Sequence, residues 1–273
     1  MPFTPSHAIV ALPFLRTPLI PAAIAIGAMT PDLPLFVRVL VPDYMVTHDL
    51  RAIALTATIA LVLLLVWRCL LRPAVRPLAP RWLARRLPRG WDAGARAAVR
   101  ETFPSLVGVI WLVVSLLIGV ASHIVWDAFT HEGRVGTALW PALSHPWGPL
   151  DGYKWMQYGS TAFGLVVLGV AALVWFVRRR AVTGTAPYAP RALQITWWLS
   201  LPVFLLAAWI WGLAAFGPLT ASFTVRHLAY RVLPPACAVW GVFTLAVCLI
   251  APSLARRAMR SIPQDLIPSD AAR

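Results

Sequence analysis

The stretch SLVGVIWLVVSLLIGVAS at residues 105–122 decides the fold class. It carries no charged side chain, and with its apolar neighbours it extends over about 104–126. A helix needs roughly 20 mostly apolar residues to cross the hydrocarbon core of a membrane. A strand exposed to lipid would leave its backbone hydrogen bonds unsatisfied. The stretch is therefore predicted to be a membrane-spanning helix.

Four further segments have the same character, at about 52–71, 155–177, 193–213 and 232–252. Only 12% of the residues are charged, whereas a soluble domain has about a quarter. The sequence therefore predicts an all-α, polytopic integral membrane helix bundle. We expect one transmembrane domain over 1–252, followed by a polar tail at 253–273.

The basic residues predict the orientation of these spans. Arginines are concentrated in three segments, 72–100, 178–191 and 256–273, which follow every second span. Basic loops stay on the cytoplasmic side, so these segments and the C-terminus are expected there. The segments 43–51, 127–154 and 217–231 then face the other side. The net charge of +14 is explained in this way, and no nucleic-acid partner is expected.

The N-terminal region is apolar but interrupted by prolines. Its two pieces, 3–15 and 17–29, are each shorter than a full span. We expect a pair of short, re-entrant helices that enter from the outer face, because irregular backbone at membrane depth has to be buried in protein. One tilted span is the alternative.

The strongest chemical motif is SHIVWDAFTHEG at residues 122–133. His123, Asp127 and His131 follow one another at four-residue spacing, which on a helix places them along one stripe. Such groups at the end of an apolar helix are costly unless they are paired or bind a metal. The motif indicates a metal or catalytic site. Interfacial histidines that bond to the neighbouring backbone are the alternative.

Topology brings further polar residues to the same face. His48 and Asp49 stand at the outer end of the first long span. His7 and Asp32 lie in the apolar N-terminal region, and Asp32 is close to two prolines. A carboxylate without a partner would be expensive there. The alternative for His7 and Asp32 is a helix start and a turn residue or cap.

The segment SHPWGPLDGYKWMQYGS at 144–160 is a second polar region on this face. Its polar side chains are candidates for a substrate entrance, in which Lys154 attracts an anionic group. The alternative is a Pro/Gly turn with aromatic residues at the headgroup level. The polar residues in question are His145, Asp151, Lys154 and Gln157. His227 is interpreted as an interfacial headgroup contact.

Four motifs together resemble a known family. They are the opening MPFTPSH, MTPD at 29–32, SHIVWDAFTH at 122–131 and the run GYKWMQYGS at 152–160. The sequence resembles the bacterial domain-of-unknown-function 4184 membrane proteins, over roughly residues 1–180 by motif. That family looks related to the YdjM-type inner-membrane metal-dependent hydrolases, and more distantly to zinc-dependent phospholipase C and single-strand nuclease folds. The resemblance implies a helical protein of the bacterial cytoplasmic membrane that holds metal ions with His and Asp.

Residue by residue, the resemblance implies that His7 and Asp32 are N-terminal ligands and that His123 and Asp127 form an H-x3-D pair. His48 corresponds to the histidine before the first long span, although Asp49 follows it where the hydrolases have Ser. All expected ligands, or residues that support ligands, carry His or Asp side chains: they are His7, Asp32, His48, His123, Asp127 and His131. Mixed ligation of this kind suits zinc, with manganese or iron as alternatives.

Two functions follow as hypotheses. The first is a membrane-bound metal-dependent hydrolase that acts on phosphoesters such as phospholipid headgroups, with Asp49 or Glu132 as proton acceptor. The spacing does not select between these two residues. The second is a non-enzymatic membrane protein whose polar cluster is a structural metal site, a proton relay or a transport path. A shallow cluster favours the first and a cluster at the midplane favours the second.

Overall fold

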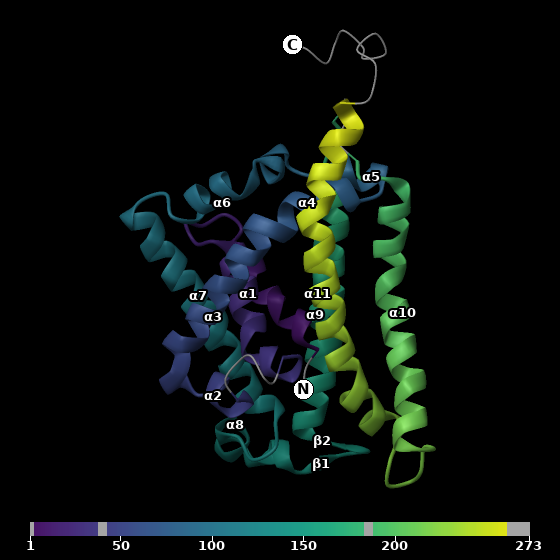
Figure 1. Cartoon of the computed structure of the whole chain (residues 1–273). Helices are drawn as coiled ribbons and strands as arrows, with labels where there is room; N and C mark the ends of the chain where they lie inside the picture. Colours follow the sequence, from purple (N-terminus) through teal and green to yellow (C-terminus); the bar gives the residue numbers. More distant parts are fainter. Residues whose placement is uncertain (1–2, 38–42, 183–187, 261–273) are drawn as a thin grey trace. The chain divides into compact units, whose positions relative to one another are not determined.

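The computed structural model describes residues 3–37, 43–182 and 188–260 (Figure 1). Almost all regular structure within these residues is helical. Five helices in this part of the chain are long and apolar enough to cross a membrane: Leu50–Leu78, Leu106–Thr130, Gly152–Arg178, Arg191–Phe216 and Val225–Met259. Each contains one of the segments predicted from hydropathy, or most of it. The all-α fold class is confirmed, and the five helices indicate a multi-pass membrane protein.

The described residues fall into two compact units. The first lies within Met1–Pro34, Arg38–Leu65 and Arg100–Arg178. Two of its helices are long, α7 (Leu106–Thr130) and α9 (Gly152–Arg178). Its other elements, some of which extend to the unit's edges, are η1 (Thr4–Phe14), α1 (Pro21–Met29), η2 (Thr30–Leu35), α2 (Tyr44–Thr47), η3 (Leu50–Ala52), α3 (Ile53–Val66), α8 (Val135–Leu139), η6 (Pro141–Ser144), β1 (Pro146–Trp147) and β2 (Leu150–Asp151). β1 and β2 form a two-stranded antiparallel hairpin.

The N-terminal region forms two short helices, as expected, because prolines limit both of them. Pro21 occupies the first helical position of α1, where its missing N–H is not needed. η1 packs along α9, where the backbone N–H of Phe3 donates to Thr161 Oγ1 at 3.0 Å. α1 packs along α7, and the two helices run parallel, since Ile20 contacts Ser115 and Ala28 contacts His123. Its first turn is bound to α7 by the N–H of Ile20, which donates to Ser115 Oγ at 2.9 Å.

Gly119 lets α1 and α7 approach backbone to backbone. A Cβ atom at this position would overlap the carbonyl oxygen of Ile24 and lie 2.8 Å from the backbone nitrogen of Ala28. Gly27 faces it from α1, and a Cβ there would lie 2.7 Å from the carbonyl oxygen of Leu116. Small residues allow such close packing between helices in membranes. This contact brings the end of α1 beside His123.

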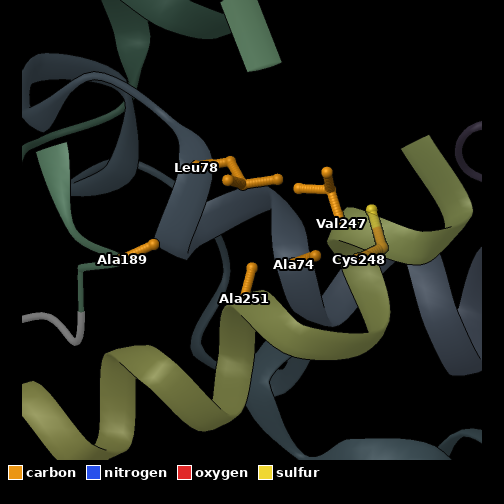
Figure 2. Packing of buried hydrophobic residues seen from close by; sticks show 6 residues of the cluster. All are labelled: Ala74, Leu78, Ala189, Val247, Cys248 and Ala251. Carbon is orange, nitrogen blue, oxygen red and sulfur yellow. The ribbon is translucent and has the colours of Figure 1, made fainter. Parts of the chain in front are cut away.

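The second unit lies within Leu35–Val37, Val66–Val99 and Arg179–Arg273. Its elements are the π-helical turn η4 (Trp67–Leu71), α4 (Arg72–Leu78), α5 (Arg81–Ala84), η5 (Arg89–Asp92), most of α6 (Gly94–Thr102), α10 (Arg191–Phe216) and α11 (Val225–Arg260). α10 and α11 pack against each other, and α11 packs against α4. Figure 2 shows the core between them, formed by the buried residues Ala74, Leu78, Ala189, Val247, Cys248 and Ala251.

Arg76 organises the arginine-rich segment of this unit. Its guanidinium is buried and binds the Asp92 carboxylate, with Nε 2.8 Å from Oδ2. It also donates to the carbonyl oxygens of Ala84, Leu87 and Pro88. One guanidinium therefore binds the last residue of α5, the turn after it and η5, in a segment that the sequence predicted to be a basic loop.

The last helix is longer than the sequence predicted. α11 continues through Pro252 to Arg260, so the first part of the segment expected as a loose tail is helical. Ala251 and Ala255 are completely buried, which keeps one face of the helix packed beyond the apolar run. The rest of the expected tail, 261–273, lies outside the described residues.

Candidate metal centre

Four side chains of the first unit converge at one end of α7. One ligand atom from each of Asp32, His48, His123 and Asp127 lies within 4.8 Å of the other three. All four residues are buried, and they come from η2, the end of α2 and two successive turns of α7. The group could hold a metal ion. Because His123 and Asp127 lie in the last two turns of α7, it is shallow rather than at the midplane of that helix.

Backbone carbonyls set the orientation of both histidines. Nδ1 of His123 lies 2.7 Å from the carbonyl oxygen of Ala28, and Nδ1 of His48 lies 2.9 Å from that of Tyr44. A carbonyl only accepts, so each Nδ1 must carry the proton. In a neutral ring, Nε2 then presents a lone pair to the centre of the group. The two Nε2 atoms lie 3.1 Å apart.

The two carboxylates surround this pair. Asp32 Oδ1 lies 3.6 Å from His123 Nε2 and 3.7 Å from His48 Nε2. Asp127 Oδ2 lies 3.5 Å and 3.6 Å from the same two nitrogens. Both oxygens are buried and make no hydrogen bond within the described structure. Two facing lone pairs and two unsatisfied carboxylate oxygens require a cation, either a metal ion or a proton on one ring.

His7 and His131 adjoin this group without belonging to it. The His7 ring stacks on the His123 ring with centroids 4.1 Å apart, and its Nε2 lies 3.7 Å from Asp127 Oδ1. Nδ1 of His131 lies 3.1 Å from the backbone oxygen of Asp127. Nε2 of each ring is buried and without a hydrogen-bond partner among the described residues.

Burial keeps these two rings neutral. It lowers the pKa of His7 to about 4 and also lowers the pKa of His131, both of which lie outside the five candidate spans. Neutral imidazole is the form that binds metal ions. The site therefore has further nitrogen donors beside the four-residue group.

Comparison with known proteins places the chain in a family whose match includes the residues of this site. A model of the family described as "Domain of unknown function (DUF4184)" matches residues 1–254. The chain belongs to this family. The match extends beyond residues 1–180, over which motifs carried the resemblance, and it includes all six expected ligands. No curated protein and no solved structure matches the chain.

The structure does not bring the two expected proton acceptors into the group. Asp49 is exposed and accepts from the backbone N–H of Arg51 at 2.8 Å, as the cap of η3. Glu132 is also exposed, and its Oε2 accepts from the Tyr153 hydroxyl at 3.1 Å. Within the described residues, neither carboxylate contacts the four-residue group.

The segment at 144–160 contains a turn. His145 is exposed at the start of the β1–β2 hairpin, and Lys154 Nζ is paired with Asp151 Oδ2 at 2.9 Å. Gln157 is buried in the first part of α9. His227 is exposed at the start of α11, where its Nδ1 bonds to Thr224. These residues lie outside the four-residue group.

Sequence reasoning missed the groups that hold the ligands in place. The Thr4 hydroxyl donates to Asp32 Oδ2 at 2.6 Å, which leaves Oδ1 to face the histidines. The Thr47 hydroxyl donates to the carbonyl of Pro31 at 2.8 Å and so ties α2 to the Asp32 segment. Thr4 stands inside the motif MPFTPSH, which was a signal for it. The carbonyls of Ala28 and Tyr44 give no signal, because any residue supplies one.

Proposed function

We propose that the protein is a membrane-bound metal-dependent hydrolase that acts on phosphoesters, with zinc as the metal. The observation that carries the proposal is the pair of Nε2 atoms 3.1 Å apart, with two buried carboxylates beside them. Four ligand atoms that surround a zinc ion tetrahedrally, each about 2.0–2.2 Å from it, lie roughly 3.3–3.6 Å from one another. Five separations between ligand atoms of the group run from 3.1 to 3.7 Å, so the donor set fits such an ion.

The roles of the residues follow from their contacts. Asp32, His48, His123 and Asp127 would hold the metal, and Thr4 with the carbonyls of Ala28 and Tyr44 would fix the ligands, as groups behind metal ligands do. A bound metal would lower the pKa of its water from about 15.7 toward 7 and polarise a phosphoryl oxygen.

His131 is our candidate proton acceptor. It donates through Nδ1 to the backbone of Asp127, so Nε2 keeps its lone pair. Its side chain is 20% exposed, more than any residue of the four-residue group. Asp49 and Glu132, the acceptors expected from the sequence, are occupied by other contacts. His131 therefore offers a ring nitrogen without a partner among the described residues, beside the buried group.

Sidedness supports a substrate at the membrane surface. In the predicted topology, the outer end of the first candidate span follows His48. The outer end of the second is the end of α7, and that of the third is the start of α9. The arginine-rich segments alternate with them along the chain. By the positive-inside rule the site faces the extracytoplasmic side of a bacterial cytoplasmic membrane, and the C-terminus is cytoplasmic. The resemblance to YdjM-type hydrolases favours the same membrane, and phospholipid headgroups are phosphoesters within reach of such a site.

Elemental analysis of the purified protein tests the metal. Wild type is expected to carry zinc, whereas His123→Ala and Asp127→Ala are expected to lose it. His145→Ala is the matched control, because its exposed ring lies outside the group. Wild type with no more metal than either variant would falsify the proposal.

Hydrolysis is tested on the same samples. The zinc-loaded protein in phospholipid vesicles is expected to release a phosphorylated headgroup or phosphate, and His131→Ala is expected to keep its zinc but lose most of this activity. A protein that holds zinc and releases neither product contradicts the hydrolase.

A structural metal site is the second candidate, favoured by the count of four buried protein ligands, since structural zinc sites are closed and catalytic ones keep a position open. It predicts that zinc raises the thermal stability without any hydrolysis. The shallow position of the group in α7 does not favour a transport path, which needs access from both sides.

A further inference from the structure

Arg134 is placed at the rim of the metal centre by the turn that ends α7. The chain reverses at Gly133, whose φ of 71° lies in the left-handed region that favours glycine. α8 begins directly after Arg134. The buried Thr137 hydroxyl donates to the carbonyl oxygen of Arg134 at 2.8 Å, which fixes the backbone here.

The guanidinium of Arg134 lies one aromatic ring away from a ligand. Its Cζ is 5.9 Å from the centre of the Tyr44 ring, and the Tyr44 ring packs on the His48 ring with centroids 3.8 Å apart. Its Nη2 lies 3.8 Å from Met45 Sδ, and a thioether is only a weak acceptor. Arg134 thus keeps most of its donors for another partner.

The local charges favour an anion at this place. A divalent metal would balance the carboxylates of Asp32 and Asp127, so a loaded centre with neutral histidines would carry no net charge. Lys154, which the sequence suggested for an anionic group, is neutralised by Asp151. Glu132 is held by Tyr153. Among the described residues, no carboxylate lies within 4 Å of the Arg134 guanidinium, which therefore leaves one positive charge at the rim.

We propose that Arg134 binds the phosphoryl group of the substrate beside the metal centre and so selects phosphate-bearing molecules. The proposal rests on the proposed function and names its substrate class. A guanidinium has two parallel N–H donors that match two oxygens of a phosphoryl group. Free phosphate compounds and lipid headgroups share this chemistry.

The test measures the binding of inorganic phosphate to zinc-loaded protein in detergent by calorimetry. Arg134→Gln is expected to weaken the affinity roughly 10- to 100-fold, because it removes charge-assisted hydrogen bonds. Arg134→Lys is expected to recover only part of it, since an ammonium lacks the fork. Arg178→Gln is the control, because it removes the same charge at the far end of α9 and is expected to bind like wild type.

A second arm separates the two sources of the phosphoryl group. In nanodiscs of phosphatidylcholine with phosphatidic acid, a lipid substrate competes with inorganic phosphate. The apparent phosphate affinity of wild type then falls, and that of Arg134→Gln changes little. If the phosphate affinity of wild type is the same with and without phosphatidic acid, the result indicates that the substrate is a soluble phosphate compound. Both results support the proposal.

Zinc content is measured on every sample. If wild type and Arg134→Gln both hold zinc and bind phosphate with equal affinity, the role of Arg134 is overturned and the metal centre is not. Wild type that holds no zinc overturns the metal centre and this inference together.

Discussion

His48 and His123 direct their Nε2 atoms at each other across 3.1 Å, while the Nδ1 of each ring donates to a backbone carbonyl. The two carbonyls belong to Tyr44 and Ala28, at either side of the group. Neither ring can turn away without leaving a buried Nδ1–H unsatisfied, which costs about 1–3 kcal/mol. The facing lone pairs are therefore imposed by the backbone, and a cation is the partner they lack.

Metal removal is expected to destabilise the protein because of this arrangement. A chelator should lower the Tm of wild type, since an ion bound only by the folded state stabilises it by RT ln(1 + [L]/Kd). The Tm of His123→Ala should not respond to the chelator. His227→Ala, whose ring bonds to Thr224 instead, should respond as wild type does. Identical Tm values for wild type with and without chelator contradict the metal centre.

Thr4→Val is expected to weaken metal binding without removing a ligand. The Thr4 hydroxyl holds Asp32 Oδ2 at 2.6 Å, and the loss of such supporting bonds lowers metal affinity about 10- to 100-fold. Competition with a zinc-binding dye measures the affinity. Thr58→Val is the control, because that hydroxyl bonds to its own helix at Ala54. Unchanged affinity in Thr4→Val would show that Asp32 needs no such support.

Gly119→Ala is expected to separate α1 from α7. The added methyl group meets backbone atoms of Ile24 and Ala28, which cannot move as a flexible side chain would. We expect a loss of about 1–3 kcal/mol in the free energy of unfolding, together with weaker zinc binding as the Ala28 carbonyl moves away from His123. Tm and zinc affinity are the measurements.

Gly169→Ala is the matched control for this substitution. Gly169 is an exposed glycine of α9 with no atom within 4 Å of its Cβ position. Alanine there should be neutral or should stabilise by up to about 1 kcal/mol. If both substitutions leave Tm and zinc affinity unchanged, the close contact of α1 with α7 does not position His123.

The sequence predicted the spans because the physics behind them is local. A helix in lipid needs a long apolar run, and hydropathy reads that directly. The His123–Asp127 step was visible for the same reason, since four-residue spacing defines one helix face. His48 required the additional step of topology, and His7 and Asp32 required the family resemblance.

Other features of the site depend on contacts that no local pattern encodes. The carbonyls of Ala28 and Tyr44 fix the histidine rings, and every residue has a carbonyl. The engagement of Glu132 with Tyr153 depends on how α9 meets the end of α7. Arg134 looked like an ordinary polar residue of HEGR until the turn at Gly133 placed it over Tyr44.

Arg76→Lys is expected to destabilise the second unit although it preserves the charge. The guanidinium binds Asp92 and three backbone carbonyls at once, and a single ammonium cannot reach all of them. We expect a loss of about 2–4 kcal/mol in the free energy of unfolding, measured as a lower Tm. Arg89→Lys, at an exposed position of the same segment, should leave the Tm unchanged. At temperatures below the Tm, the zinc content of Arg76→Lys should equal that of wild type, because all of the expected ligands belong to the first unit. Loss of zinc in Arg76→Lys would show that the metal centre depends on the second unit as well.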